Sequence, residues 1–413
     1  MTTRELLVHV ELDAVAVPCG RLWARSLPRP SASFEYDAAW LARRGRFALE
    51  PSLPLGRGQF HTASALFPVL GDTAPDRWGQ TLMRRMERVR ARREGRAPRS
   101  LGDVDFMTGV DDRTRLGALR YAEPAAPNRF LATSERPVPP LLELPRLLSA
   151  TRRVLTDEET DEDLDLVLAP GTSLGGARPK ASVRGADGTL YVAKFARDDD
   201  DWPVIRWEAT ALALAVRCGL RVPASRLETV ARKAVLLVTR FDRTSHGRVP
   251  YMSAMTAITA SDGDARSYLD IVDALRREGS HAREDLHELW SRMVFNMLIS
   301  NTDDHLRNHG FLRDARGWRL APAFDLNPVP VDVRPRVHAL AIDETDPTAS
   351  LETALAVAPR FGVAAKAARA RAAELARGVK TWRVVAAKAG LKPRDLDRMA
   401  SAFEHADLTR ALR

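Results

Sequence analysis

A group of carboxylate, amide and imidazole side chains follows the apolar stretch at residues 293–300. It includes Asp303 and Asn308, and Asp325 follows a second apolar stretch further along the chain. Polar residues that emerge together at the end of an apolar element are typical of catalytic loops. Carboxylate and amide oxygens are hard ligands that suit magnesium, which nucleotide phosphates would also bind. We therefore predict a magnesium-binding catalytic loop here.

The histidines of this loop allow a second interpretation. His305 and His309 could form an HxxxH zinc pair, but such a pair needs a helix and a third ligand. Gly310 and the turn-like surroundings argue against a helix. We expect His305 to contact phosphate or to orient the loop instead.

A glycine-rich segment and a strand lysine precede the loop. Residues 171–180, GTSLGGARPK, could form a backbone nest for phosphate, although a plain turn would have the same composition. The segment is not a Walker A loop, because its lysine lacks the following Ser or Thr. Lys194 lies in a strand-like apolar run, and Glu208 in the next helix is a suitable anionic partner. A surface lysine is the alternative for Lys194.

The order and spacing of these residues match the catalytic elements of protein kinases. Asp303 and Asn308 are five residues apart, as are the catalytic Asp and the metal-binding Asn of the kinase loop. Lys194 and Glu208 correspond to the strand lysine and helix glutamate that hold ATP phosphates. Asp325 stands where a second magnesium carboxylate would be.

The rest of the sequence indicates the kind of fold that positions these residues. Apolar residues make up 45% of the 413 residues and charged residues 28%, which is typical of a globular protein of two or three domains. We see no transmembrane run or signal peptide, and the two cysteines cannot form a disulfide framework, so we expect a cytoplasmic protein. Short strands near the N-terminus form a hairpin around Asp13, and Asp37 caps a helix. After residue 166 strands dominate, and after residue 250 helices do.

Two charged stretches lie between these regions. Arginines account for 56 of the 63 basic residues, and they are densest at residues 83–99, MRRMERVRARREGRAPR. We interpret this stretch as a solvated basic helix, with a phosphate-backbone or partner contact as the alternative. The acidic residues 157–163 are expected to be solvated, with nothing fixing their side chains. Recurring prolines before residue 145 predict a linker.

The sequence resembles the HipA family of serine/threonine kinases, the toxin components of bacterial type II toxin–antitoxin pairs. The blocks SFEYDAAWLA, LGDTAPDRWGQ, SLGGARPKA, VAKF, RFDR, NTDDHLRNHGF and FDLNP stand in the family's order. The resemblance implies an α+β, two-lobed protein-kinase-like fold with a β-rich N-terminal accessory domain and a mainly helical C-terminal lobe. The implied divisions are an accessory domain at 1–125, a linker and acidic segment at 126–165, a kinase N-lobe at 166–247 and a helical C-lobe at 248–413.

The resemblance also implies roles for individual residues. Asp303 would accept the proton of the substrate hydroxyl, and Asn308 and Asp325 would hold Mg²⁺. Lys194 would contact the phosphates of ATP and pair with Glu208. The positions that would surround the nucleotide are Gly175, Gly176, Ala177, Arg178, Pro179 and Lys180 in the loop, Thr239, Arg240 and Phe241 at the adenine hinge, and His305 and Arg307 near the phosphates.

Regulation and partners follow from the same resemblance. Ser173, or the neighbouring Thr172, would be autophosphorylated and so switch the kinase off, because a phosphate there would repel ATP. The family acts with a HipB-like, DNA-binding antitoxin, phosphorylates aminoacyl-tRNA synthetases and is associated with persistence. DNA contact is expected only through the antitoxin complex, and no membrane contact is expected.

Some positions depart from the best-known members. The loop reads GGARPK where some have GAQEK, Asp304 stands where glycine is common, and Thr239 stands where a glutamate can stand. The alternatives are a pseudokinase that acts as a co-repressor with an antitoxin, and a kinase for a small molecule or lipid. The intact set of catalytic residues argues against the pseudokinase, whereas only an assay separates a protein kinase from a kinase for small molecules or lipids.

Overall fold

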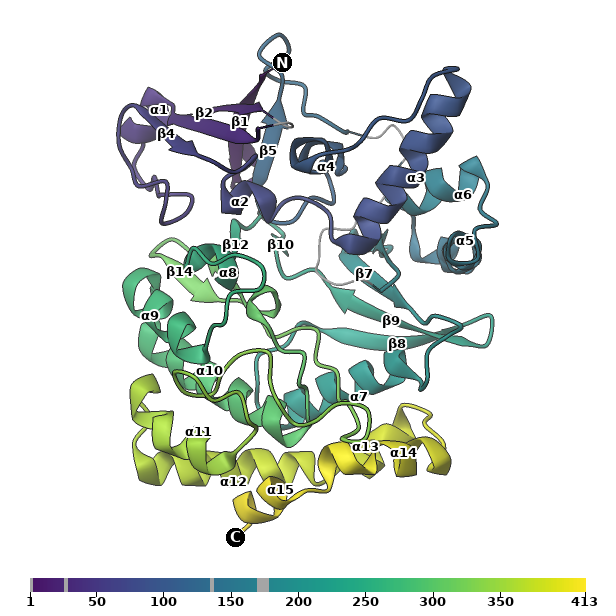
Figure 1. Cartoon of the computed structure of the whole chain (residues 1–413), viewed down its shortest axis with the longest axis vertical. Helices are drawn as coiled ribbons and strands as arrows, with labels where there is room; N and C mark the ends of the chain where they lie inside the picture. Colours follow the sequence, from purple (N-terminus) through teal and green to yellow (C-terminus); the bar gives the residue numbers. More distant parts are fainter. Residues whose placement is uncertain (1–2, 26–28, 134–136, 169–177) are drawn as a thin grey trace. The chain divides into compact units, whose positions relative to one another are not determined.

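The structure is a computed structural model that describes residues 3–25, 29–133, 137–168 and 178–413. The proposed autophosphorylation site Ser173 and the loop residues Gly175, Gly176 and Ala177 lie outside these ranges. The chain divides into two compact units, which we describe separately (Figure 1). Unit 1 comprises Met1–Arg197, Val230–Arg232 and Thr239–Met252, and unit 2 comprises Asp198–Thr229, Lys233–Val238 and Ser253–Arg413.

Unit 1 begins with a five-stranded sheet in the order β4-β3-β2-β1-β5, in which all printed pairings are antiparallel. The predicted hairpin at Asp13 is confirmed, and Asp13 and Ala14 both have positive φ, as a tight two-residue turn requires. The predicted cap is also confirmed, because Asp37 accepts a hydrogen bond from Ala39 N at 2.7 Å. The elements are β1 Arg4–Leu12, β2 Val15–Arg25, β3 Ser31–Tyr36, α1 Ala38–Ala42, β4 Gln59–Thr62, α2 Pro68–Gly71, α3 Arg77–Arg93, α4 Asp103–Gly109 and β5 Leu119–Ala122.

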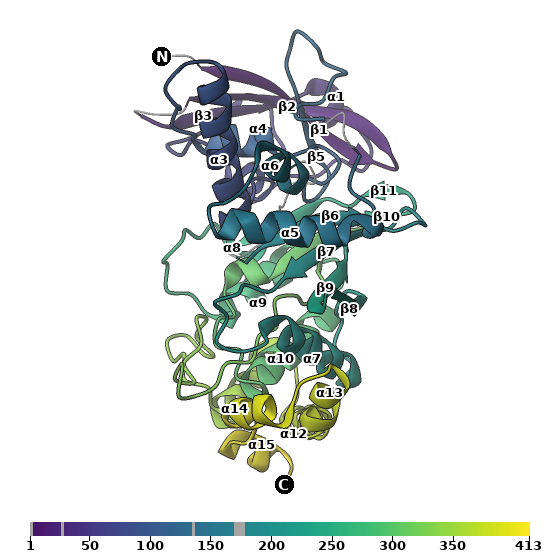
Figure 2. The ribbon, with the colours of Figure 1, turned by 90° about the vertical axis from the view of Figure 1, so that its right-hand side faces the viewer.

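Two helices occupy the segment that the sequence predicts to be a linker. After the short 3-10 helix η1 (Leu141–Glu143) come α5 (Leu144–Leu155) and α6 (Asp161–Leu168), and α6 packs against both α5 and α3 (Figure 2). The prolines that predict a linker end at Pro145, so α5, which buries a regular apolar face that includes Leu147, Ala150 and Val154, lies almost wholly after them, and the linker division at 126–165 stays a prediction.

The acidic and basic stretches bind one another. Arg85 of α3 pairs with Glu159 at 2.6 Å and with Asp157 at 2.7 Å, and Arg93 pairs with Asp161. Asp163 accepts hydrogen bonds from Thr160 at the start of α6. The expectation of unfixed acidic side chains is therefore wrong, since opposite charges that are 68 to 74 residues apart in sequence come together in the fold.

The rest of unit 1 consists of short hairpins. β6 (Lys180–Arg184) pairs antiparallel with β7 (Leu190–Phe195), and Lys180 lies opposite Lys194. β10 (Arg243–Thr244) pairs with β11 (Gly247–Arg248), and β12 (Tyr251–Ser253) follows.

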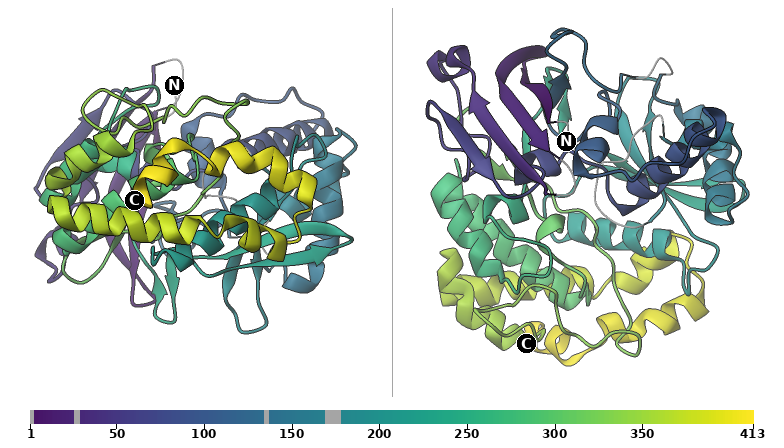
Figure 3. Two further views of the ribbon diagram at one scale, coloured as in Figure 1. Left: turned by 90° about the horizontal axis from the view of Figure 1, so that it is seen from below. Right: turned by 45° about the horizontal axis from the view of Figure 1, so that its top comes forward.

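Unit 2 is mainly helical, as the sequence predicts. Its centre is α10, in which every residue from Leu289 to Leu298 is buried, including Trp290, Met293 and Phe295. The C-terminal helices, yellow in Figure 3, lie in a layer that includes α12 packed against α10. The elements are α7 Val204–Arg217, β8 Ser225–Val230, β9 Lys233–Thr239, α8 Ala254–Ala257, α9 Tyr268–Glu278, α10 Ala282–Leu298, η2 Leu306–Asn308, β13 Gly310–Arg313, β14 Trp318–Leu320, α11 Leu351–Val357, η3 Ala358–Phe361, α12 Ala365–Val379, α13 Trp382–Lys388, α14 Pro393–Phe403 and α15 Ala406–Ala411.

Helices that could cross a membrane are absent from the described part of the chain, because none is both long enough and apolar enough.

Candidate active site

The polar loop begins where the buried helix α10 ends. Ser300 has a φ of +52°, which turns the chain sharply out of the helix. Asn301 and Thr302 remain buried, whereas Asp303 emerges with its side chain 62% exposed. The apolar helix thus fixes the root of the loop and presents one carboxylate to solvent.

Asp303 and Asn308 are neighbours in this loop. The Asn308 side chain is buried, and its Nδ2 donates to the backbone oxygen of Asp303 at 3.2 Å. Arg334 forms an ion pair with Asp303 Oδ1 at 2.9 Å. The structure therefore brings the predicted proton acceptor and one predicted metal ligand together.

Asp304 points in the opposite direction, into the protein. Its side chain is only 4% exposed, and Oδ2 accepts hydrogen bonds from Tyr268 Oη, Asn296 Nδ2 at 2.8 Å and His309 Nε2 at 2.9 Å. Burial raises the pKa of Asp304, but His309 and the other donors outweigh this effect and lower the pKa overall. An ionised Asp304 thus anchors the loop beneath Asp303.

The segment of Asp325 is attached to the same loop. Asn327 N donates to Asn301 Oδ1 at 3.3 Å, and Val329 N donates to Ser300 O at 3.2 Å. Asp325 itself is half-buried and has a φ of +57°, a left-handed conformation that is uncommon outside glycine. Such conformations cluster at functional sites, where the surrounding structure enforces them.

Several buried polar atoms around this loop have no hydrogen-bond partner within the described structure. They are Thr302 Oγ1, His305 Nδ1, His309 Nδ1, Asn327 Oδ1 and both ring nitrogens of His338. Buried polar atoms are normally satisfied by protein or water, so this concentration indicates a place where water or a ligand binds.

The oxygen donors at this loop fit magnesium. Mg²⁺ is usually bound by one or two protein carboxylates or amides together with substrate phosphates and water. Asn308 and Asp325 would supply such oxygens from two segments that are tied together. The described residues include no group of three His, Cys, Asp or Glu side chains that could hold a metal by itself.

The zinc interpretation is not supported by the loop geometry. His305 and His309 both have extended backbone conformations, so they do not share one face of a helix. His309 Nε2 is already bound to Asp304. Arg307 is exposed and pairs with Asp262 at 2.9 Å.

Lys194 and Lys180 lie opposite one another in the β6–β7 hairpin of unit 1. Lys194 is half-buried, and its strand neighbours Ala193 and Phe195, whose side chains point to the other face of the hairpin, are buried. Lys180 is 2% exposed and its Nζ lies 2.5 Å from Oδ2 of Asp76, which is 4% exposed. Asp76 also caps α3 through Gly79 N. The nucleotide contact of Lys180 stays a prediction, and its ammonium also has a structural partner.

The predicted adenine hinge, residues 239–241, also lies in unit 1. The Arg240 backbone N–H donates to Leu190 O at 2.9 Å, which ties the hinge to the strand that carries Lys194. The Phe241 ring lies 6.2 Å from the Tyr251 ring. Glu208 is buried in α7 of unit 2, so its pairing with Lys194 stays a prediction.

Sequence reasoning missed the residues that support the site. Asp304 stands out in the sequence only as a departure from the family pattern. Tyr268 lies on α9 and Asn296 on α10, the helix that leads into the loop, and no sequence motif marks either residue. Asp242 stands inside the RFDR block and was given no role. An aspartate flanked by two arginines was the one signal that could have indicated a buried ion cluster.

Comparison with known proteins identifies the family. Residues 172–383 match the HipA-like C-terminal domain, and residues 12–101 match the HipA N-terminal domain. The chain belongs to the HipA family. Its kinase-like C-terminal domain contains the loop and the Asp325 segment described above.

Individual relatives agree with this assignment. The putative kinase Y4mE of Sinorhizobium fredii is 26% identical over 175 residues, which cover 37% of this chain and 41% of that protein. HipA of Shewanella oneidensis MR-1, solved with HipB and operator DNA, matches with a TM-score of 0.66 and 19% identity over 98% of this chain and 96% of that one. The predicted α+β, two-lobed kinase-like fold is confirmed by this HipA structure. Helicobacter pylori CtkA matches at a TM-score of 0.39, which is too low to add to this.

Proposed function

We propose that this HipA-family protein is an ATP- and Mg²⁺-dependent serine/threonine protein kinase. The observation that carries the proposal is the loop that exposes Asp303 beside Asn308 and is tied to the Asp325 segment. A pseudokinase would have no need for an exposed carboxylate on a loop that is anchored from below.

In the proposed reaction, the hydroxyl oxygen of a substrate serine or threonine attacks the γ-phosphorus of ATP. The hydroxyl proton passes to a carboxylate oxygen of Asp303, the bond from the γ-phosphorus to its bridging oxygen breaks, and ADP leaves. Bound magnesium supplies charge neutralisation on the phosphates. Asn308 and Asp325 hold it, and Lys194 orients the phosphates, so most of the rate comes from positioning.

The protein substrate and the partner are proposed from the family. The likeness to a HipA that was solved with HipB and operator DNA, over nearly the whole of both chains, supports a HipB-like antitoxin partner. DNA would be contacted through that complex. We propose a translation component, such as an aminoacyl-tRNA synthetase, as the protein substrate and Ser173 as the autophosphorylation site.

The test is the intact mass of the purified protein before and after incubation with ATP and magnesium. Wild type is expected to gain phosphate at Ser173, or to carry it already from expression. Asp303→Asn and Asp325→Asn should each lower the rate by about 10²–10⁴-fold, because each removes a group that acts on the reacting atoms.

A matched control is Asp273→Asn, which removes the same charge from an exposed position in α9. It should leave phosphorylation unchanged. Wild-type rates in Asp303→Asn would refute the role of the loop. If wild type never carries phosphate and transfers none to proteins, the co-repressor interpretation would replace the kinase, and transfer only to small molecules or lipids would point to the remaining alternative.

A further inference from the structure

A buried ion cluster lies directly beside the predicted adenine hinge. Asp242 is completely buried, and its carboxylate accepts hydrogen bonds from Arg240 Nε at 2.7 Å and Nη2 at 2.6 Å. Arg243 Nη1 donates to the same carboxylate at 2.6 Å. Burial raises the pKa of Asp242, but the charges of Arg240 and Arg243 outweigh burial and hold the pKa below its ordinary range. We call Arg240, Asp242 and Arg243 the hinge clamp.

The hinge clamp binds a turn of the N-terminal domain. Arg240 Nη1 donates to Thr114 O at 2.9 Å, and Arg243 Nη2 donates to Arg115 O at 2.6 Å. In the other direction, Gly117 N donates to Asp242 Oδ2 at 2.8 Å. The hinge clamp therefore contacts the turn between α4 and β5 through backbone atoms of the turn. These contacts fix the position of the turn without requiring particular side chains in it.

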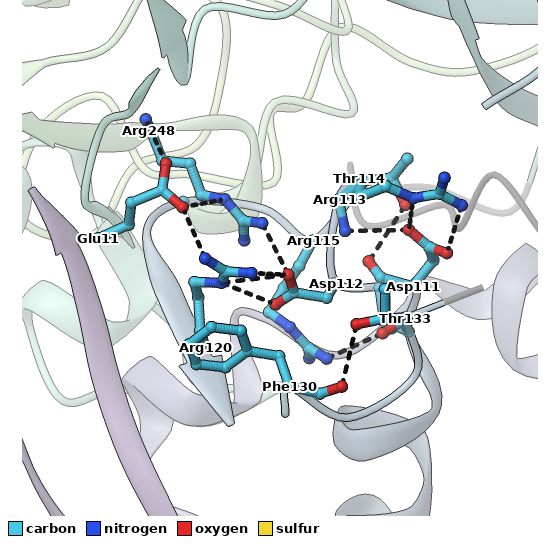
Figure 4. Close-up of polar contacts among 12 residues, drawn as sticks. Glu11, Asp111, Asp112, Arg113, Thr114, Arg115, Arg120, Phe130, Thr133 and Arg248 are labelled. Carbon is cyan, nitrogen blue, oxygen red and sulfur yellow. Dashed lines mark hydrogen bonds and ion pairs between the residues drawn. The ribbon is translucent and has the colours of Figure 1, made fainter. Parts of the chain in front are cut away.

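The turn is itself fixed by a second set of ion pairs (Figure 4). Asp112, at the centre of the view, binds Arg120 and, at 2.9 Å, Arg248. Glu11 of β1 binds the same two arginines at 3.2 and 3.1 Å. Because β1 is an inner strand of the five-stranded sheet, these bonds attach the turn to the core of the N-terminal domain.

Gly117 shows how closely the two segments approach. Its φ is +74°, and a Cβ atom at this position would lie 3.1 Å from the backbone nitrogen of Tyr251. The strained φ and the close approach both require glycine. The turn and the chain that follows the hinge are thus packed backbone to backbone.

We propose that Asp242 is a positioning residue for adenine, so that the N-terminal domain forms a structural part of the nucleotide site. The inference rests on the proposed ATP-dependent function. The side chain of Arg240 is held in the clamp, and its backbone N–H is held by the hydrogen bond to Leu190 O. The adenine-binding backbone and the strand of Lys194 are then parts of one rigid arrangement, which fixes where adenine sits relative to the phosphates.

The experiment compares two ligands on the full-length protein. Asp242→Asn keeps the shape of the side chain but removes the negative charge between two buried guanidinium groups, which then repel each other. We expect the Kd for Mg·ATP to rise at least tenfold by titration calorimetry. The Kd for inorganic tripolyphosphate, which has no base, should change by less than twofold. Asp13→Asn, an exposed position in the same unit, is the matched control.

The two-ligand design separates the possible failures. If wild type does not bind ATP, the proposed function and this inference both fall. If wild type binds ATP and Asp242→Asn binds it equally well, the inference is wrong while the function stands. Equal losses for both ligands would show a general structural role and would also overturn the inference. If Asp242→Asn does not fold, Arg240→Lys decides, because it keeps the charge but loses the bidentate geometry. It should weaken ATP binding selectively.

Discussion

The anchor beneath the catalytic loop offers the sharpest prediction. Asp304 is buried, and its three side-chain donors, Tyr268, Asn296 and His309, all bind the same oxygen, Oδ2. Asp304→Asn can place its amide oxygen there and keep all three hydrogen bonds without the charge. Asp304→Ala removes the acceptor and leaves three buried donors unsatisfied.

The magnitudes follow from these contacts. Hydrogen bonds to a charged group are roughly twice as strong as neutral ones, so Asp304→Asn should lower the free energy of unfolding by about 2–3 kcal/mol. An unsatisfied buried donor costs about 1–3 kcal/mol, so Asp304→Ala should cost about 3–9 kcal/mol. That is comparable with the whole stability of a typical protein, about 5–15 kcal/mol. Asp304→Asn should therefore still fold, so that its activity can be measured. Asp304→Ala tests, through its loss of stability, whether these hydrogen bonds anchor the loop.

Turnover should fall because the three hydrogen bonds are weaker without the charge, so that the loop is displaced more easily. A displacement of about 1 Å at a catalytic group can cost about 10²-fold in rate. For Asp304→Asn we expect a 10- to 100-fold lower single-turnover rate of phosphorylation, with the KM for ATP within about threefold of wild type. Tyr268→Phe removes one of the three donors and should show the same effect more weakly. A wild-type melting temperature in Asp304→Ala, or a wild-type rate in Asp304→Asn, would refute the reasoning.

Two further predictions concern buried charges in unit 1. Lys180→Met removes the ammonium that Asp76 binds and should lower the free energy of unfolding by about 3–5 kcal/mol, whereas the double variant with Asp76→Asn, whose amide oxygen can still cap α3, should recover part of it in a double-mutant cycle. Additive losses would show that the pair does not interact. Burial raises the pKa of Glu50 from 4.5 to about 7, although its hydrogen bonds from Ser52 and Val69 N lower it. Between these values the folded chain holds a proton on Glu50 that the unfolded chain has lost, so the contribution of Glu50 to stability is most favourable below pH 4.5, falls by up to about 3 kcal/mol as the pH rises to 7, and is constant above. Glu50→Gln should abolish this fall and have a higher melting temperature than wild type at pH 8. If the melting temperatures of wild type and Glu50→Gln change in parallel with pH, the raised pKa of Glu50 is contradicted.

Local patterns predicted many elements of the fold correctly. The Asp13 hairpin, the helix capped by Asp37 and the mainly helical second half all depend on interactions between residues close in sequence. The helix α5 is not among the predicted elements, because the prolines before residue 145 obscure a helix whose apolar face is regular. The charged stretches were misjudged because each looks solvated when it is considered without the other. Their pairing depends on contacts between residues about 70 positions apart, which no local window contains.

The features of the candidate site also divide into those that the sequence shows and those that depend on the tertiary structure. The identity and order of Lys194, Asp303, Asn308 and Asp325 are properties of the sequence, and they are the side chains that the proposed phosphate transfer would need. The sequence does not show which of the two adjacent aspartates faces solvent, because Asp303 and Asp304 are chemically identical and differ only in what surrounds them. Asn296 and His309 are close to Asp304 in sequence, but Tyr268 reaches the same oxygen because α9 packs against α10. The sequence determined which chemistry is possible. The tertiary structure decided which carboxylate is buried and which is exposed to solvent, because desolvation depends on all the neighbouring elements together.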